Sequence, residues 1–340
     1  MTLNFAGETP DPVLAAQRRG DFIERRHRGA YAILSADGAV EDAAGDIDRP
    51  FLPRSAVKLF QALPLVESGA ADAARLSPRR LALACASHQG SERHAGEVAA
   101  WLGGLGLDAE ALLCGSQTPS DPPTRAALRA EDRPPSALHN NCSGKHAGFL
   151  TLSRELGAPE AEYLEPERPV QRRVREAFAE ATGREPEGWA VDGCSAPNFA
   201  TTLRALALGC ARVAAGALPA KRAEAARRLV AAMAAHPFEV AGEGRACTEL
   251  IEAAEGRAVI KTGAEGCFTA ILPERGLGAA LKIADGDTAA AECAMAALLV
   301  RLGAVSAEDP RVARRLRRPL FSRRGVKVGD TTATAELTRA

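Results

Sequence analysis

Two different spacings of apolar residues divide this chain into predicted strands and helices. Near the N-terminus, β-type residues lie on both sides of Asp37-Gly38, a pair typical of a hairpin turn. Over residues 55–68 the apolar side chains recur at helical spacing, and "LSPRRLALACA" begins a second helix with Ser77 as N-cap and Pro78 as first helical residue. Further helices are predicted near residues 91–102, 145–156, 169–182, 219–235 and 247–255.

Strand patterns return late in the chain, in three segments followed by one alanine- and leucine-rich helix. Because both chain ends supply strands and the middle supplies helices, we expect an α/β (α+β) fold: an antiparallel sheet built from both ends, flanked by terminal helices, with a mainly helical subdomain inserted. We expect a single catalytic unit over residues 1–340, with sheet-bearing parts at about 1–90 and 257–340 and a helical insert at about 91–256. The late strand segments are 257–263, 266–274 and 276–286, and the helix spans about 288–302.

Composition and charge narrow the classes of function. The chain has 340 residues, of which 46% are hydrophobic, so it can bury a sizeable core. Its 43 basic and 43 acidic residues give zero net charge, which provides no electrostatic case for binding nucleic acid or an anionic membrane surface. The N-terminus has no basic segment followed by an apolar one, and no run of about 18 apolar residues is present to span a bilayer. We therefore expect a soluble, cytoplasmic protein that acts on a small molecule and whose eight cysteines form no disulfides.

Lysine is used sparingly, and its positions are therefore informative. Only six of the 43 basic residues are lysines, and arginine, unlike lysine, cannot give up its proton in a protein. Lys58 follows Ser55 by three residues on one face of the predicted helix, so a neutral Lys58 would take the proton of the Ser55 hydroxyl as it attacks a carbonyl. The other lysines are Lys145, Lys221, Lys261, Lys282 and Lys327.

A second motif late in the chain strengthens this pairing. Lys261-Thr262-Gly263 ends a predicted strand, and Ser-x-x-Lys combined with Lys-Thr-Gly marks serine acyl enzymes such as class A β-lactamases and penicillin-binding proteins. Lys261 would help to keep Lys58 neutral by like-charge repulsion, and Ser87 would relay a proton to the departing amine. The plainer alternatives are that Lys261 is a solvated lysine at a strand end and that Ser87 is only a turn hydroxyl.

Glycine-bearing loops in the middle of the chain add polar and sulfur groups. Asp192 is a candidate partner for the α-ammonium of an amino acid, and Arg54 for its carboxylate, unless Arg54 only anchors the helix start. Cys142, Lys145 and Cys194 are candidate zinc ligands; two thiolates suit zinc, lysine is rarely a ligand, and chance packing of two cysteines is the alternative. An incomplete set of protein ligands would leave a position for water or substrate. The loops are "SHQGSERH" (87–94), "HNNCSGKHAG" (139–148) and "VDGCSAPNFA" (191–200).

At these residues the sequence resembles the rhizobial-type, or class 3, L-asparaginases, a family distinct from the threonine-dependent bacterial asparaginases. The resemblance runs over nearly the whole chain. It implies a serine β-lactamase-like fold, a homodimer, and hydrolysis of L-asparagine to L-aspartate and ammonia. The motifs that carry it are "RGDFIERRHRGAYAI", "RSAVKLFQALPLVESGAAD", "CASHQGSERH", "HNNCSGKHAGFL", "VDGCSAPNFA" and "KTGAEGCFTAILPERGLGAALKIADG".

Position by position, the resemblance also implies roles for the residues already singled out. It implies two tandem serine–lysine pairs, and a zinc ion that supports substrate binding rather than producing the attacking hydroxide. The pairs are Ser55–Lys58 and Ser87–Lys261, and the zinc ligands are Cys142, Lys145 and Cys194, with Asp192 beside them.

Two other functions stay open for a chain with these motifs. One is a β-lactamase or D-Ala-D-Ala peptidase on the same fold, although its substrates belong in the periplasm and no export signal is seen. The other is a sensor that binds a small molecule without turning it over. Hydrolysis of a chromogenic cephalosporin would favour the first, and asparagine that is bound but not hydrolysed would favour the second.

Overall fold

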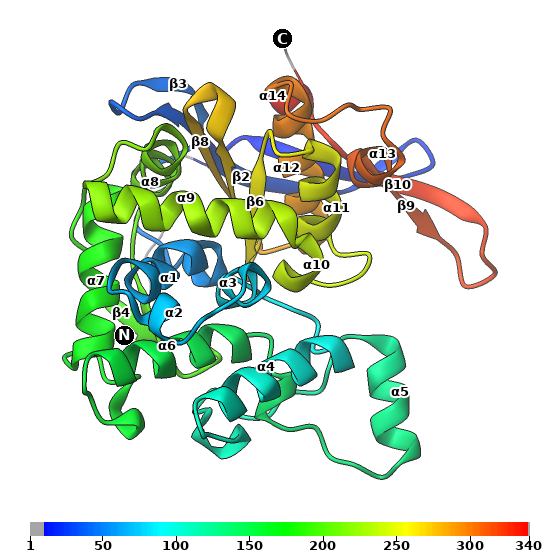
Figure 1. Cartoon of the computed structure of the whole chain (residues 1–340). Coiled ribbons are helices and arrows are strands. Elements are labelled where there is room, and N and C mark those ends of the chain that lie inside the picture. Colours follow the sequence, from blue (N-terminus) through cyan, green and yellow to red (C-terminus); the bar gives the residue numbers. More distant parts are fainter. Residues whose placement is uncertain (1–9, 339–340) are drawn as a thin grey trace, which may run out of the picture.

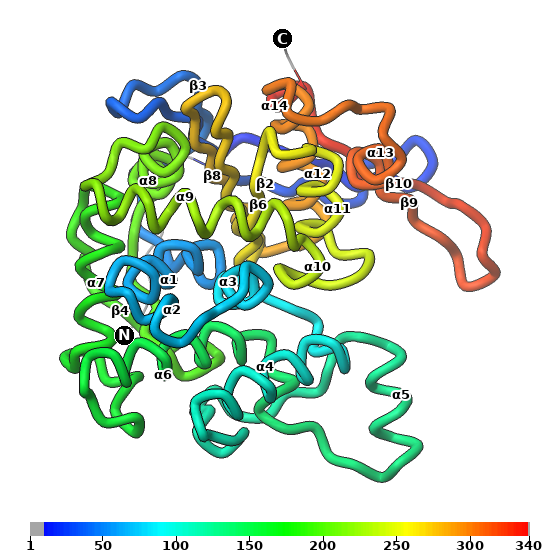
Figure 2. The backbone as a smooth tube through the Cα atoms, viewed as in Figure 1, coloured from blue at the N-terminus to red at the C-terminus, as the bar shows by residue number. Residues whose placement is uncertain are grey.

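The computed structural model describes residues 10–338, and its centre is one eight-stranded sheet. The strands are β1 (Val13–Arg19), β2 (Phe22–Ser35), β3 (Val40–Ala44), β6 (Val259–Gly263), β7 (Cys267–Leu272), β8 (Leu277–Ile283), β9 (Arg317–Phe321) and β10 (Lys327–Ala333). Their order is β6-β7-β8-β2-β1-β10-β9, β3 pairs with β2, and these pairings are antiparallel. In Figures 1 and 2 the blue N-terminal strands therefore lie beside the red C-terminal ones.

This arrangement confirms the predicted fold class, a mixed α/β fold with an antiparallel sheet from both chain ends. The predicted hairpin joins β2 to β3, and Gly38 in its turn has a φ of 94°, a region that side-chain-bearing residues rarely adopt. The three late strand segments correspond to β6, β7 and β8. The sequence pattern does not predict β1 and β9, because "VLAAQRR" and "RRPLF" contain few of the β-branched residues that mark strands.

Helices from two parts of the chain cover the sheet (Figure 1). The C-terminal helices α12 (Thr288–Arg301) and α14 (Ala335–Thr338) pack on β1 and β10, as expected for terminal helices. The buried strand β8 also carries α8 (Leu203–Ala215), which comes from the middle of the chain rather than from an end. A side-chain carbon at Gly278 in β8 would lie 2.2 Å from the backbone oxygen of Ala207 in α8, so glycine permits this close approach.

Between the two sheet-forming segments the chain is mainly helical, with one small sheet of β4 (Trp189–Val191) and β5 (Pro197–Phe199). Its helices include all five predicted there, with boundaries within two residues of expectation. Within residues 10–338 no single helix is long and apolar enough to cross a membrane; one pair, α8 with the helix that follows it, passes on length and composition but is bent by 90°. The other helices of this region are α4 (Glu92–Gly104), α5 (Pro122–Ala130), α6 (Ser143–Glu155), α7 (Pro169–Thr182), α9 (Ala220–Ala235), α10 (Pro237–Val240) and α11 (Ala246–Ala254).

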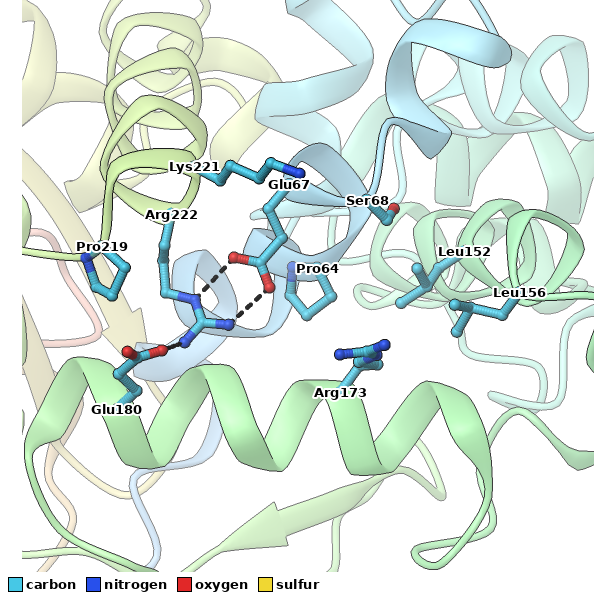
Figure 3. Close-up of a pocket in the computed structure, with 10 residues that line it drawn as sticks. All are labelled: Pro64, Glu67, Ser68, Leu152, Leu156, Arg173, Glu180, Pro219, Lys221 and Arg222. Carbon is cyan, nitrogen blue, oxygen red and sulfur yellow. Dashed lines mark hydrogen bonds and ion pairs between the residues drawn. The ribbon is translucent and has the colours of Figure 1, made fainter.

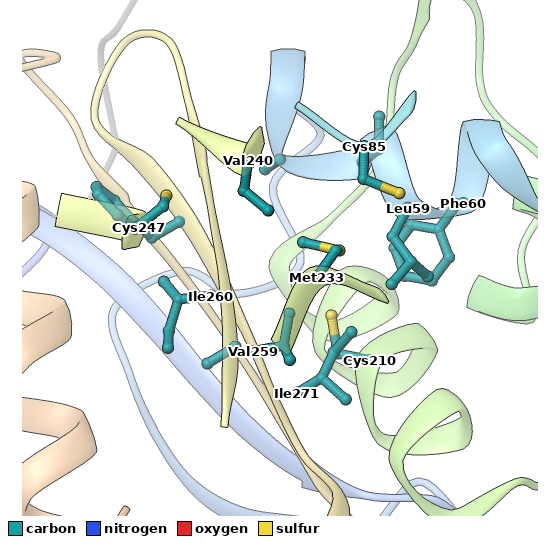
Figure 4. Packing of buried hydrophobic residues seen from close by; sticks show 14 of the residues in the cluster. Leu59, Phe60, Cys85, Cys210, Met233, Val240, Cys247, Val259, Ile260 and Ile271 are labelled. Carbon is teal, nitrogen blue, oxygen red and sulfur yellow. The ribbon is translucent and has the colours of Figure 1, made fainter. Parts of the chain in front are cut away.

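The apolar core holds the helices and the strand that carry the candidate catalytic lysines. Ser55 lies in the 3₁₀ turn η1 (Arg54–Val57), and α1 (Lys58–Glu67) follows directly, so the predicted α-helix begins three residues later than expected. The predicted N-cap Ser77 accepts a hydrogen bond from Arg80 N–H at the start of α3 (Pro78–Ala84). Figure 4 shows Leu59 of α1 and Ile260 of β6 in one buried cluster. Because each adjoins a lysine in sequence, this packing fixes both lysine backbones. The remaining short helices are α2 (Ala70–Ala73) and α13 (Pro310–Leu316).

Candidate active site

A cavity of about 260 Å³ lies where η1, the end of β6 and several loops meet. Ser55 and Ser87 both line it, together with Thr262 and Gly263 of the Lys-Thr-Gly motif. The fold thus brings together three motifs that the sequence predicted to act together. His88, Gln117, Asn141, Arg245 and Thr288 also contribute to the lining.

Ser55 follows a residue with a strained backbone. Arg54 has a φ of 54°, in the left-handed region that residues with a side chain disfavour. Its Nε donates to Asp192 Oδ1 at 2.7 Å, and its backbone N–H donates to Asn198 Oδ1 at 3.2 Å. Burial opposes ionisation of Asp192, yet the charges of Lys145 and Arg54 hold its pKa below the ordinary value. Arg54 is therefore held in place by an ionised partner.

Arg54 and Asp192 form an ion pair with each other. Neither residue is among those that line the cavity of Ser55. Their roles as ligands of a substrate carboxylate and ammonium therefore remain predictions. The geometry supports the alternative for Arg54, that it anchors the helix start, since its two hydrogen bonds hold the turn that carries Ser55.

The glycine of the Lys-Thr-Gly motif allows β6 to lie directly against the Ser55 turn. A side-chain carbon at Gly263 would lie 2.4 Å from the backbone oxygen of Pro53 and 3.1 Å from the backbone nitrogen of Ala56. A larger residue would push the strand away from the turn. The motif therefore places β6, the strand that carries Lys261, directly beside the Ser55 turn.

Ser87 lies between two buried lysines. Its Oγ is 3.0 Å from Lys58 Nζ and 2.8 Å from Lys261 Nζ. Lys58 Nζ also donates to two backbone oxygens, so it has three oxygen acceptors, the number that an ammonium group can satisfy. Within residues 10–338 no hydrogen bond joins Lys58 to Ser55, so Ser87 is the hydroxyl in direct contact with both amines.

The surroundings of Lys261 favour its neutral form. Burial lowers the pKa of Lys261 from 10.5 to about 7, and the charge of Lys58 acts in the same direction. A neutral Lys261 amine can accept the hydroxyl proton of Ser87 while Lys58 donates to the same oxygen.

Backbone hydrogen bonds fix the loop that carries Ser87. Ser87 N–H donates to Val240 O at 2.9 Å, and Gln89 N–H donates to Ala241 O at 3.0 Å. His88 lies 3.0 Å from Ser143 Oγ through Nε2, and its Nδ1 accepts a hydrogen bond from a backbone N–H. Burial holds the pKa of His88 well below 6.5, so its ring stays neutral and adds no charge to the cavity.

Cys142, Lys145 and Cys194 form a second buried centre. Lys145 Nζ lies 3.1 Å from Cys194 Sγ. A hydrogen bond from Cys194 holds the pKa of Cys142 well below 9.0, and the same bond raises the pKa of Cys194. Burial acts to lower the pKa of Lys145, but the two cysteine sulfurs raise it above its ordinary value. The centre therefore holds a thiolate, a thiol and an ammonium group.

Of the three side chains in this centre, the two cysteine sulfurs are suitable zinc ligands. The lowered pKa of Cys142 favours the thiolate that zinc binds, and Cys194 is adjacent to it. Lys145 would become a ligand only after losing a proton that its surroundings hold tightly. Among residues 10–338 no group of three or more His, Cys, Asp and Glu side chains is placed to hold a metal ion. None of the eight cysteines is in a disulfide.

A family model of known proteins matches nearly the whole sequence of this chain. The model described as L-asparaginase II covers residues 15–333. The chain belongs to the L-asparaginase II family. This confirms the resemblance to L-asparaginases that the motifs predicted. No curated protein matches the sequence.

Solved structures similar to this L-asparaginase II family member are distant. The native form of Mglu in 4.3 M NaCl is 17% identical, with a TM-score of 0.44 over 84% of this chain, which spans only 61% of the length of Mglu. A putative β-lactamase from Bacteroides dorei is 13% identical over 75% of this chain and 84% of its own, with a TM-score of 0.39. A β-lactamase from Mycobacterium bovis is 14% identical over 80% and 94%, with a TM-score of 0.34. Scores this low add nothing to what the sheet and site of this chain show.

A larger cavity of about 380 Å³ in this family member lies away from the motifs, between α1, α6, α7 and α9 (Figure 3). Its Arg222 is bonded to both Glu67 and Glu180, so these charges satisfy one another. Ser68 and Lys221 also line it, but both are exposed, in contrast to the buried lysines beside Ser87. The serine–lysine cavity is therefore the better candidate active site.

The cavity also contains residues that no motif singled out. Arg245 directly precedes α11 and Thr288 begins α12, and Gln117 accepts a hydrogen bond from Asn141 N–H at 3.1 Å. One signal for Arg245 was present in the sequence. "AGEGRACTEL" is a fourth glycine-bearing segment that runs into a helix start, as the segments 87–94 and 139–148 do.

Proposed function

We propose that this chain is an amidohydrolase that converts L-asparagine to L-aspartate and ammonia through an acyl-serine intermediate on Ser55. Membership of the L-asparaginase II family supports amide hydrolysis. The observation that carries the mechanism is the position of Ser87 Oγ, between two lysine amines at 3.0 and 2.8 Å in the cavity that Ser55 lines. Lysine amines that can lose a proton activate serine hydroxyls.

In the first half-reaction Ser55 is the nucleophile. Its Oγ bonds to the side-chain amide carbon, and its proton passes to Lys58 Nζ, three residues later in the chain. For this step Lys58 must be neutral, and Ser87 provides the route by which its proton reaches Lys261. The carbon–nitrogen bond then breaks, and a proton returned through Ser87 leaves with the nitrogen as ammonia.

In the second half-reaction water hydrolyses the ester. The lysine pair accepts a proton from water as its oxygen bonds to the acyl carbon, and the bond to Ser55 Oγ breaks. Ser55 regains its proton and L-aspartate is released, so the enzyme returns to its starting state. Lys261, with its pKa of about 7, can exchange this proton near neutral pH.

Zinc binding, a homodimer and a cytoplasmic location are further proposals. Cys142 and Cys194 would hold the metal, with Lys145 as a third ligand after it loses its proton. Bound zinc would supply a Lewis acid that holds a substrate oxygen or nitrogen. The serine hydroxyl already provides the nucleophile, so the two thiols would serve substrate binding.

Ammonia release from L-asparagine and L-glutamine tests this function, with and without added zinc. We expect Ser55→Ala to lower turnover of L-asparagine by more than about 100-fold, because it removes the nucleophile. Ser68→Ala, at an exposed serine in the other cavity, is the matched control and should keep full activity.

Each other outcome points to a different function. A Ser55→Ala variant that keeps more than about a hundredth of the activity would exclude the serine mechanism. Rapid hydrolysis of a chromogenic cephalosporin with no ammonia from asparagine would favour a β-lactamase. Asparagine that binds the wild-type protein without being hydrolysed would favour a sensor.

A further inference from the structure

Arg245 is a charged side chain of the candidate active-site cavity, and within residues 10–338 its side chain has no partner. It is half-buried before α11 and lines the same cavity as Ser55 and Ser87. Its guanidinium makes no hydrogen bond or ion pair with any residue in the described range 10–338. Arginine offers five N–H donors in a planar fork that matches a carboxylate. A free guanidinium in a cavity wall is therefore a binding group for an anion from solution.

Two acids that might have paired with Arg245, one on α11 and one beside the Ser55 turn, are engaged by other arginines. Glu249 lies one helical turn later on α11, but Arg314 and Arg315 bind its two oxygens at 2.5 and 2.7 Å. Asp192, beside the Ser55 turn, is bound by Arg54 at 2.7 Å. Within residues 10–338, no acidic side chain is therefore paired with the Arg245 guanidinium.

The loop before Arg245 is packed against the loop of Ser87. Gly242 and Gly244 have φ values of 113° and 67°, and a side-chain carbon at Gly242 would lie 2.5 Å from Gln89 Cδ. The hydrogen bonds from Ser87 and Gln89 N–H groups also end on the residues just before Gly242. The backbone therefore fixes where Arg245 stands relative to the reacting groups.

We propose that Arg245 binds the α-carboxylate of the substrate and so limits the substrates to amides that carry a carboxylate. This inference rests on the proposed amide hydrolysis at Ser55. No acidic residue lines the cavity within residues 10–338, so an α-ammonium group meets only uncharged oxygens there, such as those of Gln117 and Ser120. The cavity recognises the carboxylate by charge and the amino group only by hydrogen bonding. Removing the carboxylate from the substrate should therefore weaken its binding more than removing the amino group.

Two analogues of L-asparagine separate these groups. β-Alaninamide lacks the α-carboxylate and keeps the amine, whereas succinamic acid lacks the amine and keeps the carboxylate. We expect the wild-type enzyme to hydrolyse succinamic acid better than β-alaninamide, as measured by kcat/KM from ammonia release. The order would be reversed if the amino group were the main recognition element.

The variant Arg245→Gln tests the residue itself. It should lower kcat/KM for L-asparagine by about 100-fold, chiefly through KM, because the lost interaction is present in both the ground state and the transition state. For β-alaninamide it should change kcat/KM by less than about twofold, because this substrate has no carboxylate to lose. Arg245→Lys should restore part of the activity, since it keeps a charge without the planar fork. Arg227→Gln, at an exposed arginine paired with Glu224, is the control and should have no effect.

A binding measurement keeps this inference separate from the proposed function. Calorimetric titration with L-aspartate reports carboxylate binding whether or not any amide is hydrolysed. Weaker binding by Arg245→Gln in a protein without amidase activity would overturn the proposed function and leave the carboxylate site standing. Equal L-aspartate affinity in wild type and Arg245→Gln, or an equal loss of activity on asparagine and β-alaninamide, would overturn the role of Arg245.

Discussion

Lys261 and Lys145 are buried to the same extent, each with 3% of its surface exposed, yet the structure shifts their pKa values in opposite directions. Lys261 contacts a hydroxyl and a backbone oxygen, and burial lowers its pKa to about 7. Lys145 faces the sulfurs of Cys142 and Cys194, which raise its pKa despite the same burial. Burial alone therefore does not decide whether a lysine can act as a base. The groups that the amine contacts decide it.

The two centres are neighbours but have different chemistry. Asn141 O accepts a hydrogen bond from Lys58, and Cys142 is the next residue in the chain. One centre can exchange a proton near neutral pH, and the other holds its proton and neutralises a thiolate. The contrast is what the proposed function requires, with proton transfer at the first centre and substrate or metal binding at the second.

Replacing lysine by arginine breaks the comparison most strongly, because arginine keeps the charge but cannot accept a proton. We expect Lys58→Arg and Lys261→Arg each to lower kcat/KM for L-asparagine by about 1,000-fold, the size of a lost general base. Lys221→Arg, at an exposed lysine in the other cavity, should leave ammonia release unchanged. Full activity in Lys58→Arg would mean that the lysine is only a cationic anchor.

Breaking the thiol centre should affect binding rather than turnover. Cys142→Ser and Cys194→Ser should each lower the zinc content measured by elemental analysis and raise KM for L-asparagine by about 10- to 100-fold, with kcat nearly unchanged. Cys293→Ser is the matched control, because Cys293 is a buried thiol that donates to Leu316 O, a bond that a serine hydroxyl can also make. A metal-free wild-type enzyme would refute the zinc site, and a collapse of kcat with unchanged KM would refute its supporting role.

The sequence could predict the fold where local chemistry is decisive. The turn at Asp37-Gly38, the cap at Ser77 and the helical periods of the middle region are each determined within a few residues, and the structure has all of them. The edge of the sheet was less predictable. β1 is stabilised by pairing with β10, more than 300 residues away, and a pairing of this kind leaves no local pattern to recognise.

The candidate site shows the same limit. The Ser-x-x-Lys and Lys-Thr-Gly motifs predict which residues gather, because their chemistry is specific to certain residue types. They do not predict that Ser87 rather than Ser55 contacts both amines, which depends on the hydrogen bonds of the Ser87 loop to Val240 and Ala241. Nor do they reveal Arg245, whose proposed role depends on the engagement of Glu249 by other arginines.

The smallest expected effect is the dependence of kcat/KM on pH. It is also the most direct test of the lowered pKa of Lys261. The proposed mechanism requires a neutral Lys261, so kcat/KM for L-asparagine should rise about tenfold per pH unit below pH 7 and level off above it. Lys221→Met should leave this profile unchanged. An acid optimum would contradict the assignment of Lys261 as the group that accepts the proton.

The stability of the protein gives a readout of the same proton without any substrate. In the unfolded chain Lys261 keeps its proton up to about pH 10.5, whereas in the folded protein it loses it above about 7. Between these values the unfolded state binds more protons, so the free energy of unfolding should rise with pH, by about 1.4 kcal/mol per unit, relative to Lys261→Met. Urea unfolding of both proteins from pH 7.5 to 9.5 measures this difference. A difference that stays constant over this range would mean that Lys261 keeps its proton in the folded protein, as Lys145 does, and the contrast between the two lysines would disappear.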